Sequence, residues 1–163
     1  MLFRSVRLWQ QILAFRERQL GPDHLDTATS LNKLALLYKA EGRHEEAEPL
    51  YRRSLAIREK VLGPGHPDTA TILNNLGRLM ESQGRYGEAE SLYKQTLAIY
   101  ETALGPWHAS TAISLNNLAA LYDSQGRKNE AERLYKRAIA IKERVLGPDH
   151  PSTASSLNNL AAL

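Results

Sequence analysis

The sequence repeats itself with a period of 42 residues, and this feature constrains the fold more than any single motif does. The phrase Leu-Gly-Pro-x-His begins at Leu20, Leu62, Leu104 and Leu146, without insertion or deletion between the copies. A fixed period of this length is typical of repeat proteins, in which each unit buries its apolar face against its neighbours. We therefore expect a repeat array.

Each repeat contains two helical patterns separated by a Gly-Arg turn. The first pattern covers about residues 26–40 and the second about residues 44–61. Their apolar residues recur at the three- and four-residue steps of one helix face: Leu31, Leu34, Ala35 and Tyr38 in the first, and Ala47, Leu50, Tyr51, Leu55 and Ile57 in the second. The turn glycine can adopt the left-handed conformation that ends a helix, which favours a helix pair in every repeat.

The pattern Leu-x-x-Leu-Ala-x-x-Tyr, followed by glycine and then by Ala-x-x-x-Tyr, resembles the tetratricopeptide repeat. The residues that carry the resemblance are Leu31, Leu34, Ala35, Tyr38, Ala47, Tyr51 and Ser54. Leu31 replaces the signature tryptophan of that family, and Met80 stands at the aromatic position of the second unit. The family period is usually about 34 residues, and the 42-residue form is similar to the repeats of kinesin light chains and of bacterial relatives.

This resemblance implies an all-α fold, namely a right-handed superhelical solenoid of antiparallel helix pairs. We expect one domain over residues 1–163, with three full repeats and a half repeat at each end. The full repeats are expected at 21–62, 63–104 and 105–146, with a lone second helix at 1–20 and a lone first helix at 147–163.

The two half repeats lack their partner helices. Residues 152–163 of one molecule could therefore stack on residues 1–20 of another in a head-to-tail contact. The alternative is that the chain is a fragment of a longer repeat array.

The four histidines of the repeated phrase, His24, His66, His108 and His150, raise the question of a metal site. Equivalent residues of stacked repeats lie about 10 Å apart, whereas zinc needs several nitrogen ligands at about 2.0–2.1 Å. We expect no metal and a role at the helix start or in loop packing; a ligand contact or pH sensing in each repeat is the alternative.

Trp107 is the one departure within this phrase, because its counterparts are Asp23, Gly65 and Asp149. We expect it to pack against the next helix; the alternative is contact with a partner.

Two rows of asparagines recur in the first helix of the repeats, although asparagine is a poor helix former. They are Asn32, Asn74, Asn116 and Asn158 in one row, and Asn75, Asn117 and Asn159 in the other, where Lys33 replaces the asparagine of the first unit. At about 100° per residue, neither row faces the core of its own helix pair. In the family that the chain resembles, this face of the first helix lines the concave groove.

A carboxamide both donates and accepts hydrogen bonds, so it can hold the backbone of an extended peptide. We therefore predict a non-catalytic scaffold that binds a peptide or partner segment through the asparagines, Lys33, Lys39 and Arg78. The alternative for one row is a bond to the neighbouring repeat. Glu81 and Asp123 oppose the basic residues, which argues against a preference for acidic peptides toward the C-terminal end.

Composition excludes several classes of function. The net charge of +3 arises within residues 1–20, so the chain lacks the basic stripe of a nucleic-acid-binding protein. It has no cysteine, no apolar run of the ~18 residues that a membrane span needs, and no phosphate loop, nucleophile elbow or His-Glu metal motif. We predict no catalysis, no cofactor, no nucleic-acid or membrane partner, and a cytoplasmic location.

Overall fold

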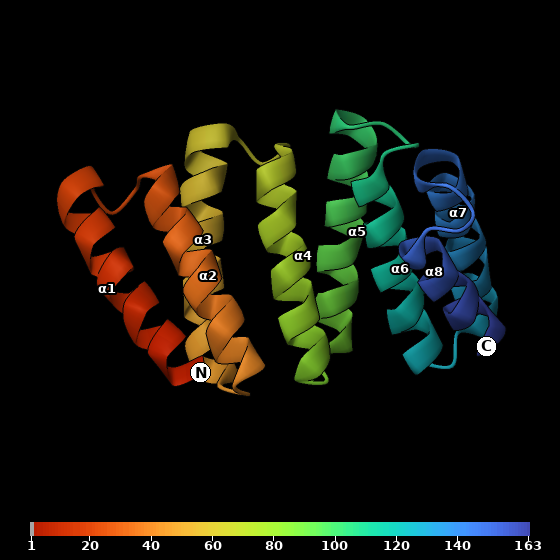
Figure 1. Cartoon of the computed structure of the whole chain (residues 1–163), viewed down its shortest axis with the longest axis horizontal. Coiled ribbons are helices and arrows are strands. Elements are labelled where there is room, and N and C mark those ends of the chain that lie inside the picture. Colours follow the sequence, from red (N-terminus) through yellow and green to blue (C-terminus); the bar gives the residue numbers. More distant parts are fainter. Residues whose placement is uncertain (1) are drawn as a thin grey trace. The chain divides into compact units, whose positions relative to one another are not determined.

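The structure is a computed structural model that describes residues 2–163, with side chains from residue 5 onward. These residues form eight α-helices and no strand (Figure 1). The helices are α1 (Leu2–Leu20), α2 (Leu25–Ala40), α3 (His44–Leu62), α4 (Pro67–Ser82), α5 (Tyr86–Ala103), α6 (Ala109–Ser124), α7 (Lys128–Leu146) and α8 (Pro151–Ala161). The expected all-α fold is confirmed, and the two helices expected near 26–40 and 44–61 are α2 and α3.

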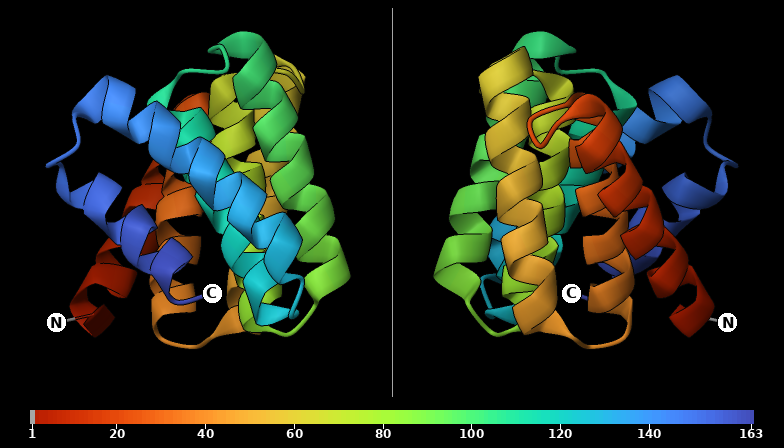
Figure 2. Two further views of the ribbon diagram at one scale, coloured as in Figure 1. Left: turned by 90° about the vertical axis from the view of Figure 1, so that its right-hand side faces the viewer. Right: turned by 90° about the vertical axis from the view of Figure 1, so that its left-hand side faces the viewer.

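The helices belong to two compact units. Unit 1 is Met1–Gly84 and contains α1 to α4, whereas unit 2 is Arg85–Leu163 and contains α5 to α8. Within unit 1, α2 packs against α1 and α3, and α3 packs against α4; within unit 2, α6 packs against α5 and α7, and α7 packs against α8. Figure 2 shows α1 beside α2 in its right-hand view and α8 following α7 in its left-hand view. The single-domain organisation and the superhelical hand stay predictions.

Each unit has an apolar core built from equivalent positions of the repeat. In unit 1 the core consists of Ala28, Leu31 and Ile57, with Leu13 and Leu50 packed against it. In unit 2 it consists of Ala112, Leu115, Ala138 and Ile141, with Leu97 and Leu134 packed against it. The expected apolar face of α2 is buried, since Leu31, Leu34, Ala35 and Tyr38 are at most 6% exposed. The predicted periodicity therefore identified the core of the helix pair.

The Leu-Gly-Pro-x-His phrase forms a helix connection with a fixed hydrogen-bond pattern. Its glycine has a positive φ, for example 93° at Gly63, in the region that favours glycine. Its histidine is the N-cap of the following helix, and Nδ1 accepts a hydrogen bond from the backbone N–H two residues later, at 3.0 to 3.1 Å. The pairs are His24 with Asp26, His66 with Asp68, His108 with Ser110, and His150 with Ser152. The expected helix-start role is confirmed for all four histidines.

A threonine that the motif analysis missed closes the same connection. Its hydroxyl donates a hydrogen bond to the glycine carbonyl at 2.9 to 3.0 Å in the pairs Thr27 with Gly21, Thr69 with Gly63, Thr111 with Gly105, and Thr153 with Gly147. All four threonines are fully buried. The threonine recurs with the same 42-residue spacing, so the signal was present in the sequence.

Replacing His108 by alanine is expected to destabilise unit 2 by about 0.5–2 kcal/mol, because the N–H of Ser110 loses its side-chain acceptor. The matched change His108→Asn retains an N-cap acceptor and is expected to have a much smaller effect. Urea unfolding followed by circular dichroism measures both variants. Equal destabilisation by alanine and asparagine would show that the histidine acts through packing and not through the cap.

Candidate binding surface on the first helices

In unit 1, the first helices of two neighbouring repeats are joined by an asparagine pair. Nδ2 of Asn75 in α4 donates a hydrogen bond to Oδ1 of Asn32 in α2 at 3.0 Å. Asn32 is only 9% exposed, and Asn75 is half-buried. This bond fixes which end of each amide faces its neighbour.

Asn116 in unit 2 makes a different contact. Its Oδ1 accepts a hydrogen bond from Oγ of Ser156 in α8 at 2.9 Å, and Oγ of Ser156 accepts one from Nζ of Lys142 at 2.6 Å. The counterpart of Ser156 in α4 is Ile72, which has no hydroxyl. In unit 2 the serine therefore replaces the asparagine as the partner, and Asn159 is half-buried on α8.

Lys142 is a buried cation that links a second helix to the first helix after it. Its Nζ also donates to the carbonyl oxygen of Ser152 at 3.1 Å, and burial lowers its pKa. Arg16 of unit 1 occupies the equivalent position and donates to the carbonyl oxygen of Asp26 at 2.9 Å and to Oγ of Ser30 at 3.0 Å. Both cations thus hold the start of the following first helix.

The cations predicted to contact a ligand all belong to unit 1. Lys39 is half-buried, and burial is the main cause that lowers its pKa. The positive charge of Arg78 lowers the pKa of Lys39 further, so the two cations lie near each other on α2 and α4. Burial also raises the pKa of Tyr51 to about 12, against the opposing influence of Arg78. Arg78 and Lys33 are exposed. The surface of α2 and α4 therefore carries three cations, opposed by the carboxylate of Glu81, which acts to raise the pKa of Lys39.

Of the remaining predicted contact residues, Asn74, Asn117 and Asn159 are half-buried, and Asn158 is exposed. Within unit 1 the structure brings together Asn32 with Asn75, and Lys39 with Arg78. The ligand-binding role of all these residues stays a prediction.

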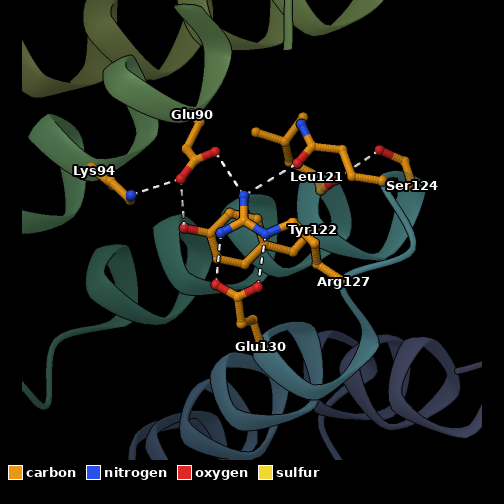
Figure 3. Close-up of polar contacts among 8 residues, drawn as sticks. Glu90, Lys94, Leu121, Tyr122, Ser124, Arg127 and Glu130 are labelled. Carbon is orange, nitrogen blue, oxygen red and sulfur yellow. Dashed lines mark hydrogen bonds and ion pairs between the residues drawn. The ribbon is translucent and has the colours of Figure 1, made fainter. Parts of the chain in front are cut away.

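A polar cluster around Glu90, which no repeated motif of the sequence indicates, joins α5, α6 and the start of α7 (Figure 3). The Glu90 carboxylate accepts hydrogen bonds from the hydroxyl of Tyr122 at 3.0 Å and from Arg127 at 2.8 Å. The same carboxylate forms an ion pair with Lys94 at 2.6 Å. The Arg127 guanidinium lies 3.8 Å from the centroid of the Tyr122 ring and also pairs with Glu130 at 2.6 Å. These contacts order the connection between α6 and α7.

The unit 1 counterpart keeps the arginine and the tyrosine but not the central carboxylate. Arg43 lies 4.2 Å from the centroid of the Tyr38 ring and pairs with Glu46 at 2.6 Å. The hydroxyl of Tyr38 accepts a hydrogen bond from Gln10 at 2.8 Å, and the residue at the position of Glu90 is the buried Val6. The stacked arginine is thus the shared feature, and the ionic cluster is particular to unit 2.

The Glu90 cluster predicts a pH dependence of stability. Hydrogen bonds from Lys94, and then from Arg127 and Tyr122, lower the pKa of Glu90 to about 2 from its usual 4.5. A lowered folded-state pKa contributes stability above about pH 4.5 that is lost as the pH falls toward 2. We expect Glu90→Gln to be less stable than the wild type at pH 7 and the difference to shrink steadily below pH 4.5, as measured by urea unfolding. A constant difference down to pH 2 would contradict this assignment.

Two features of the described residues concern metal sites and membrane spans. Among the residues that the structure describes, no three His, Asp or Glu side chains gather as a metal site would require. In the same part of the chain, no helix has the length and apolar character needed to cross a bilayer.

Comparison with known families agrees with the repeat geometry. A profile described as tetratricopeptide repeat matches residues 2–60 and 26–102, and a second profile of the same description matches residues 111–152. The chain belongs to the tetratricopeptide repeat (TPR) family. Proteins of the TPR family are typically non-catalytic and generally bind other proteins. A search of curated protein sequences returned no match.

Solved structures of other proteins have the same fold. Two of these structures are of a protein from Podosopora anserina that is designated a kinesin light chain with nearly identical TPR-like repeats. They match with TM-scores of 0.83 and 0.82. Each is 31% identical in sequence, and the match covers 99% of this chain and 76% of that chain. BtubC (BKLC) from P. vanneervenii matches with a TM-score of 0.87 and 27% identity, over 99% of this chain and 64% of that chain. The resemblance to kinesin-light-chain-like TPR repeats is therefore confirmed.

Proposed function

We propose that this TPR chain is a non-catalytic scaffold that binds an extended peptide or partner segment along its first helices. The observation that carries the proposal is the fixed orientation of the asparagine amides. Oδ1 of Asn116 is held by Ser156, and no described residue bonds to its Nδ2, which leaves an N–H donor for a peptide carbonyl. A side chain held in place before binding loses less conformational entropy when the ligand arrives.

The charges support a different ligand chemistry for each unit. Lys33 and Arg78 are exposed and have no ion pair among the described residues, so a ligand carboxylate can pair with either of them, although Glu81 lies on the same helix as Arg78. On α6 of unit 2, Ile113 is 51% exposed and Asp123 is half-buried, which favours apolar or basic ligand residues there. We propose that the chain needs no cofactor and, because it has no cysteine, that it works in the cytoplasm.

The test is to select binding peptides from a random peptide library displayed on phage and to add a selected peptide during hydrogen–deuterium exchange. We expect slower amide exchange in α2, α4, α6 or α8, because the peptide lies against the first helices. A peptide that slows exchange only in α3, α5 or α7 would contradict the proposal.

A second candidate function is head-to-tail self-assembly, and differences in burial between equivalent positions favour it. In α1, Phe15 is 64% exposed, whereas Ile57 and Ile141 at the same repeat position are 4% and 1% exposed. In α8, Leu157 is 43% exposed, whereas its counterpart Leu115 is fully buried. Because α1 is a second helix and α8 a first helix, the apolar faces of two copies can pair as one composite repeat.

Self-assembly predicts that the 163-residue polypeptide forms larger species as its concentration rises and that Phe15→Asp keeps it monomeric. The matched control Val61→Asp places the same charge at a 49% exposed apolar position away from these faces and is expected to leave assembly unchanged. Static light scattering over a concentration series measures both. A wild-type polypeptide that stays monomeric at the highest concentration excludes this candidate.

A further inference from the structure

The connection between α5 and α6 carries an exposed aromatic side chain that its counterparts lack. Trp107 is 49% exposed, and the guanidinium of Arg144 in the last turn of α7 lies 4.5 Å from the centroid of the indole ring. Arg144 is exposed and makes no ion pair or hydrogen bond with any described residue. The pair therefore presents a flat apolar surface beside a cation without a carboxylate partner.

The other repeats provide internal controls for the role of this pair. In the first repeat the same two positions hold Asp23 and Lys60, which form an ion pair at 2.5 Å. In the second repeat they hold Gly65 and Thr102, and the Thr102 hydroxyl bonds within its own helix. The chain thus uses three different pairs of residues at one structural position.

The glycine conformation and the histidine cap are the same whichever pair is present, although α5 ends at Ala103, one residue earlier than its counterparts, and the N–H of Gly105 bonds to the carbonyl oxygen of Tyr100. The glycine φ is 94°, 93° and 94° at Gly21, Gly63 and Gly105. The cap bond made by the histidine is 3.1 Å at His108 and 3.0 Å at His66, so neither the tryptophan nor the arginine is needed to form it. Neither the glycine turn nor the histidine cap therefore accounts for an exposed indole at this position.

We propose that Trp107 and Arg144 form a second interaction surface, separate from the asparagine surface, for a protein segment that carries a carboxylate beside a proline or aromatic side chain. The guanidinium donors of Arg144 match a carboxylate in a bidentate arrangement. The exposed indole offers a large contact area to a ring, and tryptophan and arginine are the residues that most often dominate binding interfaces. Charge complementarity thus selects an acidic partner.

The chain contains two tryptophans, Trp9 and Trp107, so two indole N–H signals report on this surface separately by nitrogen-15 NMR. The probe is a synthetic peptide Gly-Ser-Asp-Pro-Phe-Asp-Ser-Gly, compared with the same peptide carrying lysine in place of aspartate. We expect the acidic peptide to shift the Trp107 signal in a saturable way, with Trp9 unchanged, and about 1 M salt to weaken the binding. The lysine peptide is expected to have no effect.

Two variants test the assignment. Arg144→Gln keeps the reporting indole and should weaken binding at least about tenfold, as loss of a charged hydrogen-bond pair does. The double change Trp107→Asp with Arg144→Lys recreates the ion pair of the first repeat, and calorimetry should detect no binding while the unfolding midpoint is retained. Replacing the asparagines of the first helices should leave this binding intact.

Three results would overturn the proposal. They are a Trp107 signal that the acidic peptide does not shift at millimolar concentration, an equal shift with the lysine peptide, and a shift with phosphatidylserine vesicles but not with the peptide. The last result would assign the pair to a membrane surface.

Discussion

Replacing Leu115 by alanine is expected to lower the free energy of unfolding of unit 2 by about 2–5 kcal/mol. Leu115 is fully buried in the cluster formed with Ala112, Ala138 and Ile141, so the change removes apolar contacts between α6 and α7 and leaves a cavity. Urea unfolding at neutral pH measures the difference. A loss of this size is expected because the interior of a folded domain relaxes only partly around a missing side chain.

The matched control is Leu157→Ala, which makes the same chemical change at the equivalent position of α8. Leu157 is 43% exposed, so we expect a loss below about 1 kcal/mol in the monomer. Similar losses at both positions would contradict the assignment of Leu115 to a core that α8 lacks. A larger loss for Leu157 at high protein concentration alone would support pairing between copies.

Replacing Asn74, Asn75, Asn116 and Asn117 by alanine is expected to lower the affinity for a library-selected peptide at least about 100-fold. Each lost hydrogen bond to a ligand contributes about 0.5–1.5 kcal/mol, and 1.4 kcal/mol corresponds to a factor of ten in affinity. Calorimetric titration measures the loss. Retained affinity in this variant would show that the peptide binds elsewhere.

The stability of the same variant separates binding from folding. Alanine is the better helix former, but removing Asn75 leaves Oδ1 of the buried Asn32 without its donor, so we expect a modest net destabilisation with helicity retained. The matched control is Asn129→Ala, an exposed asparagine in the first turn of α7, which is expected to change neither affinity nor stability. A variant that unfolds at room temperature would be replaced by its single-site members.

The sequence predicted the helix pairs, their apolar faces and the role of the histidines, because each depends on residues within one repeat. The spacing of Leu31, Leu34 and Tyr38 marks one helix face whatever surrounds it. The left-handed Gly42 likewise follows from the turn alone, and its φ is 74°.

The contacts between repeats were harder to predict, because they depend on how successive helices align. Asn32 bonds to a residue 43 positions later, whereas its equivalent Asn116 bonds to one 40 positions later. The period indicates which residues are equivalent but not which pairs meet. The difference follows from a single position, where Ile72 in one repeat is replaced by Ser156 in another.

The same limit applies to the Glu90 cluster. Its partners Tyr122 and Arg127 lie 32 and 37 residues away, and the first unit places Val6 where the carboxylate would be. A search for repeated motifs favours what all units share, so it overlooks a cluster formed in one unit only.

The measurement that tests the account most directly is a crystal structure of the 163-residue chain with a library-selected peptide bound. The account predicts an extended peptide against the first helices, with a backbone carbonyl accepting a hydrogen bond from Nδ2 of Asn116. A peptide bound only to second helices or to the connecting loops, with the amide of Asn116 untouched, would contradict it.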